Sequence, residues 1–149
     1  MEAMIESFSG IPAGANQSPH TLTIRFDAEV DRVVIIDQTR LPHECVEVEL
    51  KTSADACHAI SSMQVRGAPL IGVTAAFGVY LGLRGKDDET ARSLSASVIE
   101  ALAATRPTAI NLRWALDKIE TRLARCEKNL AEIFFNLEPD FKSIGNLIL

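Results

Sequence analysis

Two arginines stand where the sequence predicts that helices begin, and each could bind an anion. Arg66 precedes Gly67, Ala68 and Pro69, and an apolar run follows at once. Proline is favoured in the first turn of a helix, where its missing N–H is not needed, and glycine lets the backbone approach a ligand closely. The first N–H groups of a helix lack partners and carry partial positive charge. An arginine beside them therefore indicates a phosphate-binding site.

The second arginine, Arg106, precedes Pro107 and Thr108 at the start of another predicted helix. The two helix starts could converge on one anion, to which each arginine would contribute a charge-assisted hydrogen bond. The simpler interpretation is a pair of solvated surface arginines on two separate loops, and spacing alone favours it. The sequence therefore leaves two hypotheses open, a shared phosphate site or two unrelated surface charges.

Residues 37–42 (Asp-Gln-Thr-Arg-Leu-Pro) form a further polar candidate. They could be a loop at the edge of a site. The pattern favours a turn between two strands, in which Asp37 accepts hydrogen bonds from nearby backbone N–H groups.

Other reactive side chains have no spacing that indicates a site. The three histidines are scattered, and the three cysteines form no Cys-x-x-Cys pair, so we expect no metal site. We interpret Cys45, Cys57 and Cys126 as packed or incidental residues, which fits a reducing cytoplasm. The sequence has neither a P-loop nor a dinucleotide-binding glycine motif, and we expect no cofactor and no catalytic residue.

The composition narrows the class of partner. A chain of 149 residues that is 47% hydrophobic and 23% charged is typical of one folded domain. A net charge of -5 argues against a nucleic-acid partner, which normally selects a basic surface. The first twenty residues lack the pattern of a signal peptide. The longest apolar run, residues 69–83, is shorter than the roughly 20 residues that span a bilayer, so we expect no membrane partner.

The elements that would position both arginines follow from hydrophobic periodicity. We expect a flexible leader at 1–20, a three-stranded antiparallel β-meander at 21–51, a helical bundle at 52–125 and a divergent tail at 126–149. Alternating apolar residues mark the strands, and the short turns between them favour antiparallel pairing. Strands followed by helices indicate the α+β class.

The helices have their own start and stop signals. Thr52 and Asp55 predict a capping box, from which a helix runs through Met63 and ends at Gly67. The small residues within the apolar run that follows indicate close contact with other helices. A third helix breaks at residues 105–108. A fourth carries one apolar stripe, formed by Leu112, Ala115, Leu116, Ile119 and Leu123.

Three blocks together resemble a known enzyme family. They are residues 36–42, residues 65–73 (Val-Arg-Gly-Ala-Pro-Leu-Ile-Gly-Val) and residues 106–116 (Arg-Pro-Thr-Ala-Ile-Asn-Leu-Arg-Trp-Ala-Leu). In this order and spacing they are similar to methylthioribose-1-phosphate isomerases. The resemblance runs from about residue 21 to residue 125. Other proteins of this fold are ribose-1,5-bisphosphate isomerases and regulatory subunits of the translation-initiation exchange factor.

The resemblance implies an aldose–ketose isomerase of methionine salvage, acting in the cytoplasm on 5-methylthioribose 1-phosphate without a cofactor. It implies substrate contacts for Arg66, Gly67, Ala68 and Arg106, and a homodimer for full-length members. Members are more than twice as long as this chain and continue into a Rossmann-like C-terminal domain. Their catalytic cysteine and aspartate motifs lie in that domain, and neither motif occurs here. The resemblance therefore covers the N-terminal part and identifies no catalytic residue in this chain.

Two alternatives remain open at this stage. The chain could be a regulatory or binding module, related to the exchange-factor subunits, that retains a sugar-phosphate or nucleotide pocket. It could also be a non-functional gene fragment, in which case the apolar helix at 69–83 would lack part of its cover and the chain would self-associate.

Overall fold

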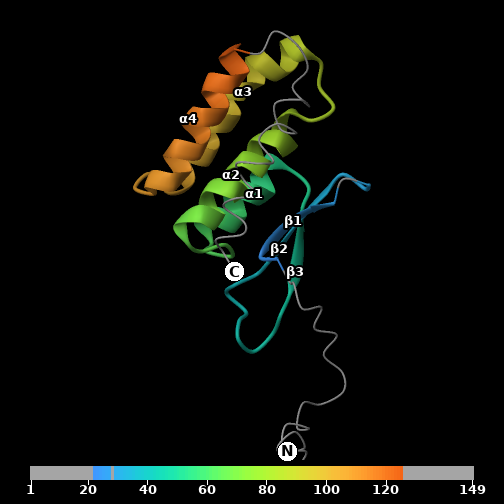
Figure 1. Ribbon diagram of the computed structural model, residues 1–149, viewed down its shortest axis with the longest axis vertical. Helices are drawn as coiled ribbons and strands as arrows, with labels where there is room; N and C mark the ends of the chain where they lie inside the picture. The colour runs from blue at the N-terminus through green and yellow to red at the C-terminus, as the bar shows by residue number, and fades with distance from the viewer. Residues whose placement is uncertain (1–21, 28, 126–149) are drawn as a thin grey trace, which may run out of the picture.

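A computed structural model describes residues 22–27 and 29–125 of the chain. Within these residues a small sheet precedes a bundle of four helices, which confirms the predicted α+β class (Figure 1). The strands are β1 (Ile24–Asp27), β2 (Arg32–Ile36) and β3 (Glu47–Leu50). The helices are α1 (Ser53–Ser61), α2 (Ala68–Leu83), α3 (Asp88–Thr105) and α4 (Ile110–Arg125).

The sheet is the predicted antiparallel meander, with β2 in the centre. Ile35 of β2 lies opposite Ile24 on one side and Val48 on the other. The sheet packs onto α2 through an aromatic cluster: the ring centroid of Phe26 lies 5.7 Å from that of Phe77 and 5.6 Å from that of Tyr80. Aromatic pairs at these separations add stability beyond the area that they bury.

Helix α2 is the centre of the bundle and contacts α1, α3 and α4. Its apolar residues are buried around the whole circumference, as an all-apolar sequence predicts for a core helix. A methyl group added at Gly78 would lie 2.9 Å from both the Ala56 Cβ and the Leu102 Cδ2. The small residues of α2 therefore permit the close contacts that the sequence predicted.

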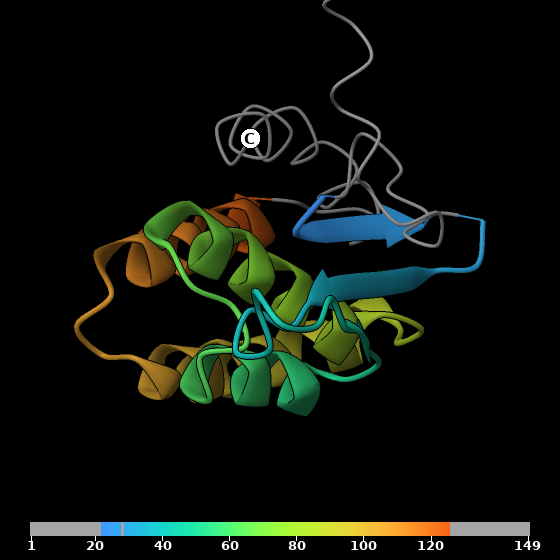
Figure 2. The same cartoon turned by 90° about the horizontal axis from the view of Figure 1, so that it is seen from below.

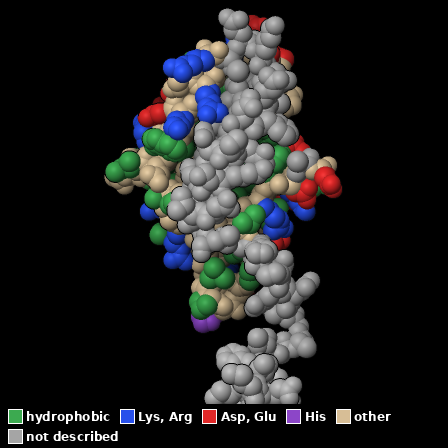
Figure 3. Space-filling model, in the orientation of Figure 1, with side chains coloured by type: hydrophobic (Ala, Val, Ile, Leu, Met, Phe, Trp, Pro, Cys, Tyr) green, Lys and Arg blue, Asp and Glu red, His purple; other side chains and the backbone are tan. Residues whose placement is uncertain are grey.

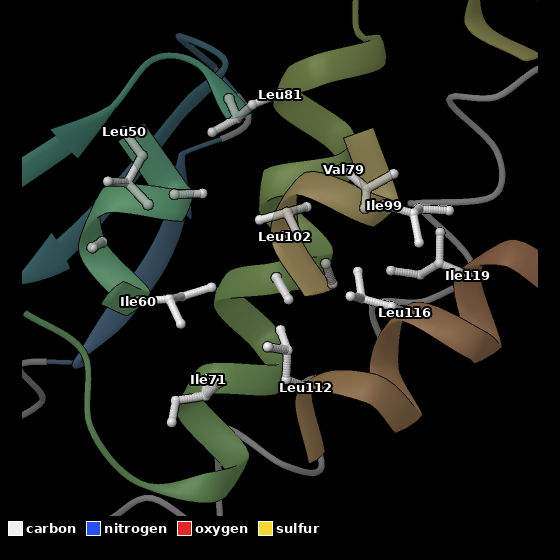
Figure 4. Packing of buried hydrophobic residues seen from close by; sticks show 14 of the residues in the cluster. Leu50, Ile60, Ile71, Val79, Leu81, Ile99, Leu102, Leu112, Leu116 and Ile119 are labelled. Atoms are coloured by element: carbon white, nitrogen blue, oxygen red, sulfur yellow. The ribbon is translucent and has the colours of Figure 1, made fainter. Parts of the chain in front are cut away.

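Helix α4 packs on α2 through the predicted apolar stripe. Leu112 and Leu116 extend from α4 towards α2, and Ile119 lies near Val79 and Ile99 (Figure 4). The whole stripe is buried, and its members are Leu112, Ala115, Leu116, Ile119 and Leu123. Because this stripe fixes how α4 lies against α2, it also fixes the positions of the two helix starts relative to each other.

The end of α1 corrects the sequence prediction. The helix was expected to run through Met63 to Gly67, but it ends at Ser61. Met63 has a φ of 64°, in the left-handed region, and its side chain is 44% exposed. Met63 lies three residues after Ile60, a spacing that is typical of one helical face, but its backbone is not helical. Residues 62–67 therefore form a loop, and this loop carries Arg66.

Two of the predicted segments, the leader at 1–20 and the tail at 126–149, lie outside the described residues. Among the residues that the structure describes, no helix combines the length and the apolar character needed to cross a membrane.

Candidate functional site

The start of α2 leaves its first N–H groups open. Gly67 is the N-cap, and it supplies no side chain to accept a hydrogen bond from the first turn. Its φ of 94° is strained for any residue with a side chain, although a Cβ at this point would meet nothing within 4 Å. Gly67 is therefore required by the backbone conformation and not by crowding. The chain turns into α2 at an exposed point that a ligand can approach.

Arg66 lies beside this helix start and is exposed. Its backbone N–H donates to the Gln38 Oε1 at 2.9 Å, and its Nη2 donates to the Gln38 carbonyl oxygen at 2.6 Å. No acidic residue pairs with Arg66 within the described part of the chain. The guanidinium therefore keeps its full positive charge without a counter-ion, as an anion-binding arginine requires.

The start of α4 borders a pocket of about 240 Å³ between the end of α3 and the beginning of α4. Arg106, which ends α3, lines this pocket and is half-buried. Arg113 and Glu100 also line it, over a floor that includes Ala103, Pro107 and Leu112. Two arginines against one glutamate leave the pocket with net positive charge.

The two helix starts lie side by side. A methyl group added at Gly72, in the second turn of α2, would lie 3.2 Å from the Asn111 carbonyl oxygen and 3.5 Å from the Ala115 Cβ. Both helices run upward from their first turns in Figure 1, and Figure 2 shows both entering loops at that end of the bundle. The first turns of α2 and α4 therefore lie close together. The pocket is lined by Arg106 but not by Arg66, Gly67 or Ala68, and joint binding of one anion by both arginines stays a prediction.

The four helices of the described residues begin in two different ways. A carboxylate lies in the first turn or at the cap of α1 and α3, where Asp55 and Asp87 accept backbone hydrogen bonds. The first turns of α2 and α4 contain no acidic residue. Since a carboxylate at a helix start takes the place that an external anion would occupy, only α2 and α4 are open to a phosphate.

The turn at residues 37–40 has the predicted local structure and one contact more. Asp37 is buried, and its Oδ1 accepts from the Thr39 Oγ1 at 2.6 Å and from the Thr39 N–H at 2.9 Å. These hydrogen bonds, that of the hydroxyl first, hold the pKa of Asp37 below its usual value. The Asp37 Oδ2 also accepts from the Gln64 Nε2 at 3.2 Å. The turn is therefore fastened to the loop that carries Arg66.

Sequence reasoning missed Arg113 and Gln38. The sequence assigned no binding role to Arg113, whereas the structure places it on the pocket beside Arg106. Its position shortly after the helix start could have indicated this. Gln38 lies far from Arg66 in the sequence, and no local pattern connects them.

The remaining candidates give no second site. No cluster of three or more His, Cys, Asp or Glu side chains in the described residues could hold a metal ion. Cys45 is exposed, Cys57 is half-buried, and burial raises the pKa of the Cys57 thiol; Cys126 lies outside the described residues. Basic and acidic side chains are interspersed over the face shown in Figure 3.

Comparison with known proteins identifies the class. The model of the Initiation factor 2 subunit family matches residues 64–133, a segment that includes both arginine-led helix starts. The chain is homologous to the N-terminal region of methylthioribose-1-phosphate isomerases, which confirms the resemblance of the three sequence blocks.

Two relatives show the extent of the homology. The chain is 45% identical over 126 residues to methylthioribose-1-phosphate isomerase of Dechloromonas aromatica, covering 80% of this chain and 34% of that protein. It is 46% identical over 117 residues to the enzyme of the same name from Nostoc sp., covering 76% and 33%. The chain thus spans about a third of the length of these relatives.

Solved structures confirm the fold. The crystal structure of 5-methylthioribose 1-phosphate isomerase from Pyrococcus horikoshii matches 86% of this chain and 36% of its own, with a TM-score of 0.72 and 31% identity. The translation initiation factor eIF-2B, subunit delta, from A. fulgidus matches 84% and 36%, with a TM-score of 0.71 and 25% identity.

Proposed function

We propose that this chain carries the phosphate-binding part of a sugar-phosphate site, and that its substrate class is that of methylthioribose-1-phosphate isomerase. The observation that carries the proposal is the pair of adjacent helix starts, α2 and α4, each without an acidic residue and each preceded by an arginine. The homology to isomerases named for a sugar phosphate supports the same ligand class.

The proposal gives four residues a role. Arg66 and Arg106 donate charge-assisted hydrogen bonds to the phosphate of 5-methylthioribose 1-phosphate. Gly67 and Ala68 present backbone N–H groups at the positive end of α2. Because donors that are fixed before the ligand arrives lose little entropy on binding, the rigid packing of α2 against α4 favours affinity.

The proposal assigns binding and no catalytic residue. Isomerisation of an aldose to a ketose moves a proton or a hydride between neighbouring carbons and needs placed acid and base groups. Burial raises the pKa of the Cys57 thiol, which makes it a weaker nucleophile, and Asp37 accepts hydrogen bonds from Thr39 and Gln64. The acid and base groups are therefore assigned to the region of the relatives that lies beyond this homology.

Three further parts of the proposal rest on homology or on sequence pattern. We assign the cytoplasm as the location, a homodimer as the assembly of full-length relatives, and methionine salvage as the pathway. We keep the division into a β-meander at 21–51 and a helical bundle at 52–125.

A titration tests the binding proposal. The 149-residue chain is titrated with 5-methylthioribose 1-phosphate and, as a control, with 5-methylthioribose without the phosphate. We expect the phosphorylated sugar to bind more than about thirtyfold more tightly, because the charged hydrogen bonds of both arginines require the phosphate. Equal affinity for both sugars, or no binding of either, would contradict the proposal. Turnover by the chain alone at the rate of a full-length isomerase would contradict the absence of catalytic residues.

A regulatory module is the second candidate. The match to an initiation-factor subunit at a TM-score of 0.71 favours it, although the identity of 25% is lower than that with the isomerases. Specific capture of initiation-factor subunits by the immobilised chain, with no sugar-phosphate binding, would select this alternative.

A further inference from the structure

The turn after β2 contacts the loop before α2 through Asp37 and, with more hydrogen bonds, through Gln38. Its backbone N–H donates to the Gln64 carbonyl oxygen at 2.9 Å. Its Oε1 accepts from the Arg66 N–H, and its carbonyl oxygen accepts from the Arg66 Nη2. Gln38 therefore holds the loop, the backbone of Arg66 and the guanidinium of Arg66 at the same time.

Gln38 is itself held in place by the turn, which is anchored at the buried Asp37. Asp37 is 8% exposed and joins Thr39 to Gln64 through its two carboxylate oxygens. The Asp37 N–H donates to the Val46 carbonyl oxygen at 2.9 Å, which attaches the turn to the chain entering β3. A residue fixed from both sides can impose its geometry on an exposed neighbour, because it does not move with that neighbour.

The hydrogen bonds leave Arg66 oriented but available. An arginine has five N–H donors, and Gln38 takes one of those in the Arg66 guanidinium, while no other partner occurs among the described residues. A free arginine loses much rotamer entropy when it binds a ligand. An arginine already oriented by one hydrogen bond loses less and keeps the other donors for the ligand.

We propose that Gln38 is a positioning residue that holds Arg66 in the orientation in which it binds phosphate. This inference rests on the proposed function, and it adds a residue from the sheet side of the molecule to a site made by helix starts. Gln38 touches no substrate in this scheme. It acts through Arg66.

The test uses two replacements of similar length in the 149-residue chain. Gln38→Met removes the side-chain acceptor. Gln38→Glu keeps an acceptor oxygen at the same place, as part of a carboxylate. Exchange of the Arg66 amide proton with water, measured by NMR without ligand, reports the hydrogen bond from the Arg66 N–H to the Gln38 Oε1, by which the side chain of Gln38 holds the backbone of Arg66. We expect exchange about tenfold faster in Gln38→Met and unchanged in Gln38→Glu, with Val65, whose N–H donates to the Ala59 carbonyl oxygen, as the internal control.

Affinity for 5-methylthioribose 1-phosphate supplies the second measurement. We expect Gln38→Met to weaken binding about fivefold, which is the effect of one hydrogen bond. The loss should disappear in a chain that also carries Arg66→Ala, because Gln38 then has no guanidinium to position. An equal loss with and without Arg66, or an affinity unchanged by Gln38→Met, would overturn the inference.

The outcomes separate the two proposals. If the unmodified chain binds no sugar phosphate, the proposed function fails, and the exchange of the Arg66 amide still decides whether Gln38 holds Arg66. Unchanged exchange in Gln38→Met overturns the positioning whatever the affinity. Faster exchange of the Arg66 amide in Gln38→Met, together with unchanged exchange in Gln38→Glu, supports the positioning role of Gln38.

Discussion

Helices α1 and α3 begin differently from helices α2 and α4, and this difference separates stability from binding. At the start of α1, the Asp55 Oδ2 accepts from the Thr52 N–H at 2.8 Å, and the Thr52 Oγ1 accepts from the Asp55 N–H at 3.2 Å. At the start of α3, the Asp87 Oδ1 accepts from the Thr90 N–H at 2.9 Å. At both helix starts, side chains of the chain itself therefore accept hydrogen bonds from backbone N–H groups that have no partner within the helix.

At α2 and α4 the chain supplies an arginine nearby and no carboxylate. Uncapped helix starts reduce stability, so a protein retains them where they have another use. Here the two starts without a carboxylate lie against each other, at Gly72 and Asn111. Carboxylates of the chain itself accept hydrogen bonds from backbone N–H groups at the starts of α1 and α3. The starts of α2 and α4 have no such carboxylate and remain open to an external anion.

Among changes to the first turn or cap of a helix, the largest effect is expected when an open start is converted into a capped one. Ala109 precedes α4, and its carbonyl oxygen accepts from the Arg113 N–H at 3.2 Å, as the carbonyl of an N-cap residue does. Ala109→Asp should raise the free energy of unfolding by about 1 kcal/mol. It should also weaken binding of 5-methylthioribose 1-phosphate by at least about tenfold, because the carboxylate repels the phosphate. Denaturant unfolding and titration measure the two effects.

Ala109→Ser is the matched control for this prediction. A serine hydroxyl caps the helix without adding charge, so stability should rise while affinity changes little. A gain in affinity in Ala109→Asp would show that α4 does not face the anion.

A smaller effect is expected at a capped start. Thr52→Ala removes one half of the capping box of α1 and should lower the free energy of unfolding by about 1 kcal/mol, without changing the affinity for the sugar phosphate. An accompanying loss of affinity, measured in the same titration, would mean that the two classes of helix start are not independent.

The capped helix starts of α1 and α3, which affect stability, and the open starts of α2 and α4, which affect binding, should respond to different ranges of pH. For Asp55, burial raises the pKa, but hydrogen bonds from the Lys51 and Thr52 N–H groups outweigh it and keep the pKa below 3.8. Hydrogen bonds from Thr90 lower the pKa of Asp87. A carboxyl group with a lowered pKa in the folded state stabilises the fold above the unfolded value and loses this contribution as the pH falls. Unfolding should therefore become easier below about pH 4.

As the pH falls, binding should weaken earlier than the fold does, because a phosphate monoester takes up a proton and loses its second negative charge near pH 6. Titrations at pH 7 and pH 5, beside thermal unfolding at both, should show weaker binding with unchanged stability. A parallel loss of stability and affinity between these values would contradict the comparison.

The fold could be predicted from the sequence because its signals are local. Alternation at 22–26 and 46–50 predicted strands, and the stripe from Leu112 to Leu123 predicted the buried face of α4. The capping box at Thr52 and Asp55 was confirmed atom by atom. The end of α1 was not predicted, since the apolar side chain of Met63 does not reveal its left-handed backbone.

The site could be predicted only in part. The arginines beside prolines predicted which helix starts matter, since helix starts have sequence signals. The contact between Gln38 and Arg66 joins residues 28 positions apart, and the pocket beside Arg113 depends on how α3 meets α4. Such contacts arise from tertiary packing, which periodicity does not describe.

The central claim is that Arg66 and Arg106 bind the same phosphate. The direct test is the affinity for 5-methylthioribose 1-phosphate of Arg66→Ala, Arg106→Ala and Arg125→Ala, where Arg125 is an exposed arginine at the far end of α4, about 22 Å from its start. We predict a loss of about thirtyfold for each of the first two variants and less than threefold for the third. Equal losses in all three, or a loss below threefold in either Arg66→Ala or Arg106→Ala, would contradict the claim.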